Sequence, residues 1–280
     1  MGSHRVTVGT QNQFQKFRNL FAQSTLGVWE FQSLDSLRNG LARQYIVGGP
    51  LAGGVPGGDG AVRFKSAIYS AYAQDEWTFS QRLNLTAGLR VDVPVFNDKP
   101  PENTAFATAY GGRKTSEIPS GNPQYSPRFG FNWDATGDAV NQVRGGVGLF
   151  TGRPAYVWLS NAFQNSGMGG VGLLTCAGAA AVQPFNNANI ATPPKLCANG
   201  ATAALSAEID LSDPDLKYPQ NLRATVGYDR RLKRNWTATA ELLYTQGVNG
   251  LFYQNLALLG IQGTNAKEGR VIYGTAPLAP

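Results

Sequence analysis

The stretch LNLTAGLRVDVPV, residues 83–95, decides the fold, because its hydrophobic and polar side chains alternate without a fault. The hydrophobic positions are Leu83, Leu85, Ala87, Leu89, Val91 and Val93. Successive side chains of a β-strand point to opposite faces, so this spacing predicts a strand with one wholly apolar face. The other face carries the charges of Arg90 and Asp92.

The same pattern recurs along the chain in pairs of runs that are separated by short turns. Residues 64–79 alternate before the first stretch, and only residues 80–82 separate the two runs, which predicts a tight hairpin. Two further hairpins are predicted, at 128–134 with 142–151 and at 221–232 with 236–247. The chain therefore predicts a meander of antiparallel hairpins.

The connections between the hairpins are long, at residues 45–61, 96–124 and 165–219. A compact soluble domain seldom tolerates structureless loops of that length. Outer-membrane barrels do, because they pair short periplasmic turns with long extracellular loops. Aromatic residues beside the short turns predict a girdle at the periplasmic interface; they are Trp77, Phe79, Trp133 and Trp236.

The two ends of the chain are less regular. Residues 4–17 alternate, residues 27–31 predict a second short strand, and residues 33–39 predict a helical turn capped by Ser33. We expect the last two outside the bilayer. Residues 252–259 and 270–274 are plausible strand pieces near the other end.

Composition excludes several classes of protein. Glycine is frequent, with 34 residues, and charged residues make up 15% of the chain, which is typical of a β-rich protein with long loops. No run approaches the 18 or so apolar residues that a spanning helix needs. The net charge of +6 is spread along the chain, so we expect no nucleic-acid partner.

A membrane setting explains the charged face of the strands. In hydrocarbon every backbone polar group must be paired within the protein, which permits only helices and closed sheets. The apolar face would then meet lipid, and the charges would line a polar lumen. The expected lumen-facing residues are Arg90, Asp92, Arg144, Arg223, Asp229 and Glu241. The predicted fold class is all-β, a partial antiparallel transmembrane β-barrel; a soluble β-sandwich is the alternative, and the long connections disfavour it.

Two cysteines, Cys176 and Cys197, lie in the longest connection. We expect a disulfide between them, with a bound metal ion or two free thiols as alternatives.

The sequence offers little for catalysis. His4 is the one histidine, and no His/Cys cluster has metal-ligand spacing, so we expect no enzyme, no cofactor and no metal site. The glycines at 145, 146, 148 and 152 have the wrong spacing for a nucleotide loop and lie in a strand pattern. We expect them to let the strand bend or be approached closely.

Several segments together carry a family resemblance. They are FQKFRNLF (14–21), AYAQDEW (71–77) followed by LTAGLRVDVPVF, YSPRFGFNWD (125–134), RGGVGLFTGRPAYVWLSNAF (144–163), NLRATVGYDRRL (221–232) and LYTQGVNGLFYQNL (243–256). In their order and loop spacing they resemble the barrel of TonB-dependent outer-membrane receptors. The match is nearest to the Oar-like branch, which carries an N-terminal carboxypeptidase-regulatory-type domain.

That resemblance implies a barrel of about 22 strands in the outer membrane of a Gram-negative bacterium, filled by a plug domain. It implies uptake of a scarce nutrient of the siderophore, saccharide or peptide class. The implied partners are outer-membrane lipid, the plug and remaining barrel of the parent protein, the TonB complex through segments not in this chain, and the small-molecule or peptide ligand. We expect residues 1–280 to be part of a single receptor barrel domain, without plug or barrel-closing strands.

Loop aromatic residues are the expected ligand contacts: Phe106, Tyr110, Tyr156 and Trp158. The lumen charges are expected to contact the plug or water. The alternatives in function are a passive outer-membrane porin or adhesive barrel, and a secreted β-rich carbohydrate-binding domain.

Overall fold

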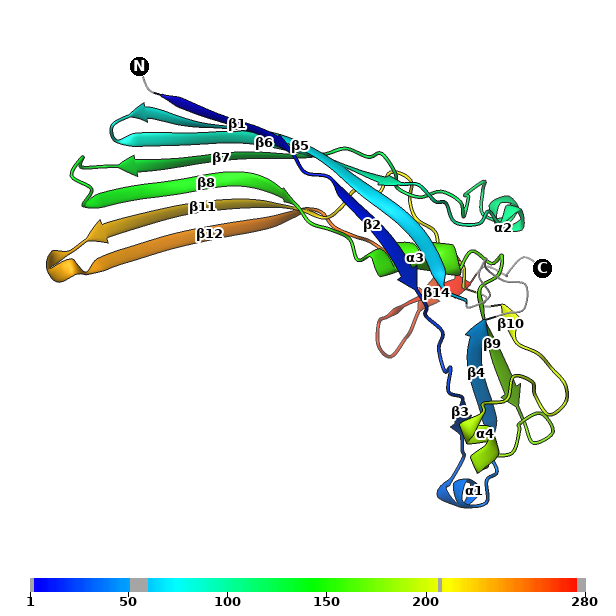
Figure 1. Cartoon of the computed structure of the whole chain (residues 1–280). Helices are drawn as coiled ribbons and strands as arrows, with labels where there is room; N and C mark the ends of the chain where they lie inside the picture. Colours follow the sequence, from blue (N-terminus) through cyan, green and yellow to red (C-terminus); the bar gives the residue numbers. More distant parts are fainter. Residues whose placement is uncertain (1–2, 51–59, 206–207, 276–280) are drawn as a thin grey trace.

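The computed structural model describes residues 3–50, 60–205 and 208–275, and its main feature is one long curved antiparallel sheet (Figure 1). The strands lie in the order β1-β5-β6-β7-β8-β11-β12, and β2 also pairs with β5. Their bounds are β1 His4–Thr10, β2 Gln13–Asn19, β5 Val62–Ser80, β6 Leu83–Phe96, β7 Gln124–Asp134, β8 Asn141–Thr151, β11 Gln220–Arg231 and β12 Thr237–Asn249. All pairings in this sheet are antiparallel, as the alternating runs predict.

The first two strands form one edge of the sheet. β1 ends opposite Ala71 and β2 begins opposite Ile68, so the register on β5 is unchanged across the break. The backbone N–H of Gln11 bridges the break by donating to the Ser70 carbonyl at 3.0 Å. The alternating residues 4–17 therefore form two strands, β1 and β2, that share one register on β5.

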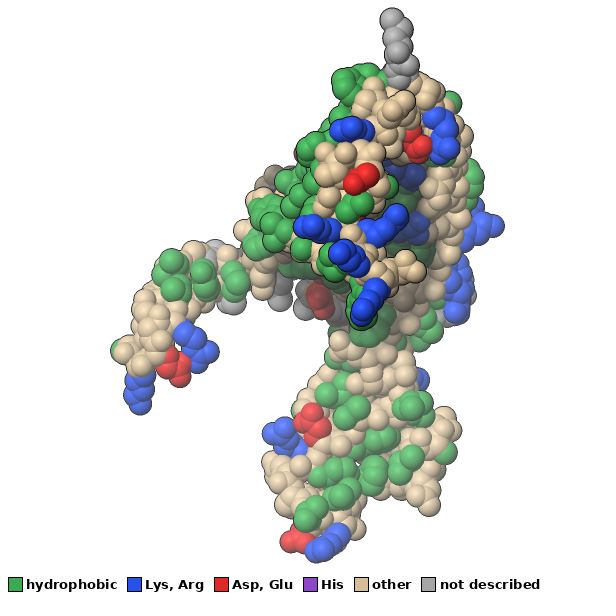
Figure 2. Space-filling view, turned by 90° about the vertical axis from the view of Figure 1, so that its left-hand side faces the viewer, with side chains coloured by type: hydrophobic (Ala, Val, Ile, Leu, Met, Phe, Trp, Pro, Cys, Tyr) green, Lys and Arg blue, Asp and Glu red, His purple; other side chains and the backbone are tan. Residues whose placement is uncertain are grey.

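The register aligns the alternating hydrophobic side chains of the predicted runs on one face, which we call the outward face. Leu85 lies between Trp77 of β5 and Phe131 of β7, and the row continues through β8 and β11 to Leu242 of β12. These side chains are half-buried or exposed, Leu242 to 68%, because no protein layer covers them. Viewed from the short-turn end, hydrophobic side chains gather along one side of the curved sheet (Figure 2).

The short turns fall where the sequence predicts them, at one end of the sheet. β5 and β6 are joined by Gln81 and Arg82, and β11 and β12 by a 3-10 turn, η1, at Lys233–Asn235. In the turn after β7 the Asp134 carboxylate accepts hydrogen bonds from the Gly137 and Ala139 amides, both at 2.8 Å.

The long connections lie at the other end and are more structured than expected. A second sheet with the order β10-β9-β4-β3 projects from that end as an arm (Figure 1). Its strands are β3 Val28–Glu30, β4 Gln44–Pro50, β9 Val171–Ala177 and β10 Ala204–Leu205, and it carries the short helices α1 Leu34–Arg38 and α4 Asn187–Ala191. Ser33 caps α1 through the Ser36 amide, as predicted.

The prediction that residues 165–219 form an unstructured connection is wrong, because β9, α4 and β10 lie within them. The stretch 45–61 was likewise expected to be a loop, yet β4 occupies its first part, and residues 51–59 lie outside the described part of the chain. β4 and β9 each find their hydrogen-bond partners in the other. More than 100 residues separate the two strands, so no local pattern reveals the pairing.

Two further helices, α2 Thr104–Ala109 and α3 Tyr156–Gln164, belong to the long connections. α3 packs on the inward face of the sheet, where Phe163 stacks on Phe64 at 4.8 Å. The core there consists of Val62, Phe64, Phe96, Ile118, Leu159 and Phe163. A separate hairpin, β13 Leu258–Thr264 with β14 Val271–Thr275, follows β12.

The main sheet is not closed within the described residues. β12 ends one side and the β1/β2 edge ends the other, each without a further strand. The described helices include none that is both long and apolar enough to cross a membrane.

Candidate functional site

The inward face of the sheet is a wall of paired charges. Within it Arg5 contacts Glu76 at 3.0 Å, and Arg90 contacts Asp92 at 2.8 Å. The register places the predicted lumen residues on this face, opposite to the hydrophobic row. The pairing leaves a polar surface on which water can solvate the remaining hydrogen-bonding groups.

Arg144 connects three strands of this wall. Its guanidinium donates to Asp229 of β11 and to Glu241 of β12, both at 2.9 Å. Gly227 lies directly opposite Arg144 and makes room, because a Cβ there would lie 3.1 Å from the Arg144 Cζ atom. The Thr239 hydroxyl adds a hydrogen bond to Asp229 at 2.7 Å. These contacts hold the last three strands of the sheet in register.

Arg90 and Asp92 form a second group near the long-loop end of the wall. The Asp92 carboxylate accepts from the Ser70 hydroxyl at 2.5 Å, and Arg90 also donates to Gln11 at 3.1 Å. The two residues are spaced by two positions on β6, so their side chains share a face and reach each other along the strand.

A third feature of the wall is its unbalanced positive charge. Arg128 and Arg223 both lie over the ring of Phe150, at 4.7 Å and 5.8 Å from its centroid. Among the described residues neither guanidinium makes an ion pair with a carboxylate. A cation over an aromatic face keeps its capacity for an anion, so this is the part of the wall best suited to attract one.

The outward face carries two rows of aromatic side chains. The predicted row of Trp77, Phe79, Trp133 and Trp236 lies at the short-turn end, and a second row of Phe14, Tyr69 and Tyr125 lies toward the long loops. Eight residues separate Trp77 from Tyr69 and Trp133 from Tyr125, about 27 Å at about 3.4 Å per residue. With a strand tilt of about 40° the height is about 20 Å, close to the hydrophobic thickness of outer-membrane barrels.

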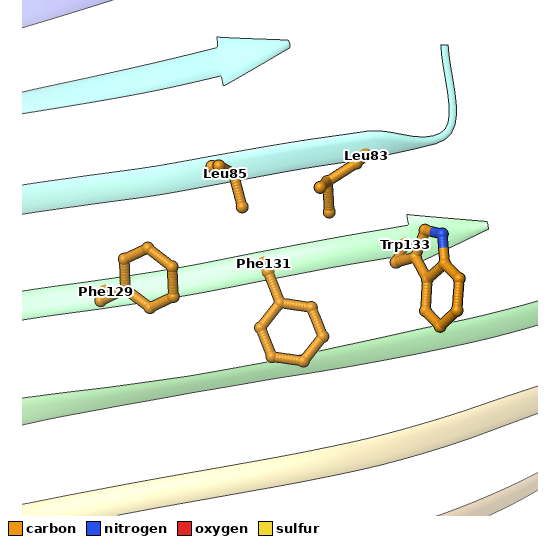
Figure 3. A pocket seen from close by; sticks show the side chains of 5 residues that line it. All are labelled: Leu83, Leu85, Phe129, Phe131 and Trp133. Carbon is orange, nitrogen blue, oxygen red and sulfur yellow. The ribbon is translucent and has the colours of Figure 1, made fainter. Parts of the chain in front are cut away.

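A shallow apolar depression of about 310 Å³ lies between these rows, near the short turns (Figure 3). Its lining side chains come from β6 and β7 and are Leu83, Leu85, Phe129, Phe131 and Trp133. It offers no charged or polar side chain, so it suits an acyl chain and no reaction chemistry.

The long loops are tied together beside the inward face. The Asn103 side chain caps α2 and also donates to the Ser166 carbonyl at 3.1 Å, and Asn165 donates to Asp210 at 2.8 Å. Tyr218 is buried close to Tyr156. Burial, together with the neighbouring Tyr156 hydroxyl, raises the pKa of the Tyr218 hydroxyl. The loops thus form a folded body whose buried core is shared with β5 and β6 of the main sheet.

The four predicted ligand contacts are not gathered at one place. Phe106 is buried in α2 and stacks on Tyr110 at 4.4 Å, while Tyr156 of α3 packs against Phe17 at 4.4 Å. Trp158 is 41% exposed and meets Tyr253 edge-on at 5.3 Å. In this arrangement the rings of Phe106 and Tyr156 serve packing, and Trp158 is the one that faces solvent.

The sequence predicts the disulfide of the arm, and the structure contains it, but the sequence does not indicate the aromatic core that surrounds it. Cys176 and Cys197 are bonded, and both are buried with Tyr45. The Tyr45 hydroxyl donates to the Pro194 carbonyl at 2.9 Å, and burial raises its pKa to about 12. Trp29 packs on the Tyr45 ring at 4.4 Å. The short run of aromatic and β-branched residues in QYIVGG, residues 44–49, is the signal that could have identified β4.

The glycines of β8 allow close approach of neighbouring groups. A Cβ on Gly146 would lie 2.9 Å from the Phe129 carbonyl oxygen, and one on Gly145 would lie 2.8 Å from the Phe131 ring. Both residues lie in a paired strand, so the prediction that they belong to a strand and not to a nucleotide loop is confirmed.

No cluster of three or more metal-binding side chains occurs in the part of the chain that the structure describes. His4 lies on the outward face, where it contacts Asp75 at 2.7 Å and stacks on Trp77 at 5.0 Å.

An antiparallel sheet with an apolar outer face between two aromatic rows and an ion-paired inner face defines a wall of a transmembrane β-barrel. Comparison with protein families agrees, because the model of the outer membrane beta barrel domain matches residues 1–276. The chain belongs to this family, and it is located in the outer membrane of Gram-negative bacteria. A search of curated proteins finds no match to the chain.

Proposed function

We propose that this chain is part of a TonB-dependent outer-membrane receptor, similar to the Oar-like branch, that takes up a scarce nutrient. The observation that carries the proposal is the folded body at the long-loop end. It consists of a disulfide-linked four-stranded sheet together with α2 and α3, and α3 rests on the inward face of the wall. Ligand-binding residues of barrels are concentrated on such loops, which a rigid wall positions.

The resembling segments support the proposal because they fall on different parts of this architecture. AYAQDEW lies on β5, YSPRFGFNWD lies on β7, and the segment 144–163 runs from β8 into α3. They therefore cover both the wall and the loop helix that packs on it.

In the proposed receptor the loops capture the ligand and the inward wall receives it. Trp158 is the leading loop contact, with Phe106, Tyr110 and Tyr156 holding the loop helices in place. Arg128 and Arg223 would attract an anionic group of the ligand or of the plug domain. Coupling to the TonB complex would use segments outside this chain, and we propose no catalytic role and no cofactor.

The open edges of the sheet support a barrel that other strands complete. In hydrocarbon the unpaired backbone groups of β12 and of the β1/β2 edge need partners. We propose that the remaining barrel of the parent protein supplies them and that residues 1–280 belong to that single barrel domain.

Uptake by cells that carry the complete protein tests the proposal. A ferric siderophore, an oligosaccharide and a peptide would be supplied below micromolar concentration, in cells with and without a functional TonB complex. We expect accumulation of one class only when TonB is present, and we expect Trp158→Ala to weaken it while the outward control Leu242→Ala does not. Uptake of each probe that is proportional to its external concentration and independent of TonB would instead indicate a passive barrel.

A further inference from the structure

Four cationic side chains lie together on the outward face, just beyond the second aromatic row, on its long-loop side. They are Lys16 and Arg18 of β2 and Arg63 and Lys65 of β5, and all four are exposed. We call this group the outward cation patch. Its residues are adjacent because the register places Lys16 opposite Lys65 and Arg18 opposite Arg63.

Alternation along the two strands fixes the side to which the patch points. Phe14 lies two residues before Lys16 and belongs to the second aromatic row, in which its ring meets that of Tyr69 edge-on at 5.9 Å. Phe17 and Phe64, the neighbours in sequence, stack on each other at 4.8 Å and contact α3 residues on the inward side. The cations therefore share the face of Phe14 and not that of the loop core.

The two lysine ammonium groups of the patch belong to residues that lie directly opposite each other. Like charges directly opposite each other destabilise a sheet, and Lys16 and Lys65 are such a pair. Asp98 lies beside them, and its carboxylate accepts a hydrogen bond from the Lys65 backbone N–H at 2.7 Å. The same residues, with Phe17 and Phe64, line a depression of about 400 Å³. An anion in this depression would relieve the repulsion between the strands.

The height of the patch relates it to the membrane surface. Lys16 and Lys65 lie two residues beyond Phe14 and Ala67, about 7 Å further along the strands at about 3.4 Å per residue. Aromatic girdles mark the level of the lipid headgroups, and the long-loop end of a barrel is extracellular. The patch thus faces sideways into the headgroup layer of the outer leaflet.

We propose that the outward cation patch binds the phosphate groups of an anionic lipid headgroup of the outer leaflet. Lysine and arginine side chains recognise phosphate by charge-assisted hydrogen bonds. A lipid fits better than a soluble anion, because its acyl chains would cover the hydrophobic side chains of the outward face directly below the patch. This site is separate from the loop body and is independent of the proposed uptake function.

Lipid retention by the complete protein, purified from outer membranes and placed in vesicles, tests the site. The probes are bis-phosphorylated lipid A and the same lipid without phosphates, and bound lipid is measured by mass spectrometry. The variant Lys16→Gln/Lys65→Gln removes two charges. At about 1 kcal/mol per charge near an anionic surface, about fivefold each, we expect about 30-fold weaker retention of the phosphorylated lipid.

Two matched variants separate charge from folding. Lys233→Gln/Arg234→Gln removes the same charge at the short-turn end and should keep retention within about twofold of wild type. Lys16→Arg/Lys65→Arg preserves the charge and should keep retention as well. In detergent without lipid, the glutamine variant at the patch should unfold at the same or a higher temperature than wild type, because the opposed charges are gone.

Three outcomes would overturn the proposal. Equal retention of the phosphorylated and dephosphorylated lipid would show that phosphate is not recognised. Equal retention by wild type and the glutamine variant at the patch would place the lipid elsewhere. Displacement of lipid A by millimolar inorganic phosphate would identify the patch as a site for a free anion.

Discussion

The disulfide of the arm gives the sharpest stability prediction, because the arm shares no strand with the main sheet. Cys176 lies on β9, and Cys197 lies 21 residues later, in the segment that returns toward β10. Closing a loop of this length removes about 3 kcal/mol of chain entropy from the unfolded arm on the loop-length relation. Loss of the bond should therefore raise the population of the locally unfolded arm by about 100-fold or more.

Amide hydrogen exchange of the complete protein measures that population residue by residue. The perturbation is reduction of the wild-type bond, which keeps both buried side chains in place, and Cys176→Ala/Cys197→Ala provides a second form. We expect faster exchange in β4 and β9 and unchanged exchange in β6 and β7 of the main sheet. Unchanged protection of β4 and β9 after reduction would refute the entropic reasoning, and equal loss of protection in β6 would refute the independence of the arm.

Three other predictions concern single side chains. Phe129→Arg places a charge midway between the aromatic rows on the outward face, so we expect a loss of about 2–4 kcal/mol in denaturant unfolding from lipid vesicles, and no comparable loss for the inward control Thr86→Arg. Gly146→Val brings a Cβ to 2.9 Å from the Phe129 carbonyl oxygen, so the same measurement should show a loss of about 1–3 kcal/mol, and an unchanged midpoint would contradict the close approach. Tyr45 has a pKa of about 12 because burial favours its neutral form, so its stabilising contribution is complete below pH of about 10 and is lost as the pH rises through 12, by at most about 1.4 kcal/mol per pH unit. Tyrosinate absorbance and circular dichroism should report this loss, and Tyr45→Phe should remove it.

The exposure of the loop aromatic residues could not be predicted from the sequence. An aromatic side chain in a long polar connection is a reasonable ligand contact, but its exposure depends on what the rest of the chain places beside it. Tyr156 faces Phe17, which precedes it by more than 100 residues, and it becomes part of a core. Trp158, two positions later on the same helix, points elsewhere and stays exposed.

The outward cation patch is a second feature that the local sequence does not reveal. Lys16 and Lys65 each look like an ordinary polar residue of an alternating run. Only the antiparallel register of β2 on β5 places them directly opposite each other. The close placement of the two lysines is therefore a property of the pairing and not of either segment.

The sequence by itself determined the strands, the short turns and the sidedness of the main sheet. It could do so because period-two alternation and short turn segments are local, and the pleat of a strand converts them directly into two faces. Only the tertiary structure decided the arm, the loop core on the inward face and the opposed cations. Each of these depends on contacts between residues far apart in the chain, such as Tyr45 beside Cys176, and the free energy that selects them comes from burial and register, which no local window contains.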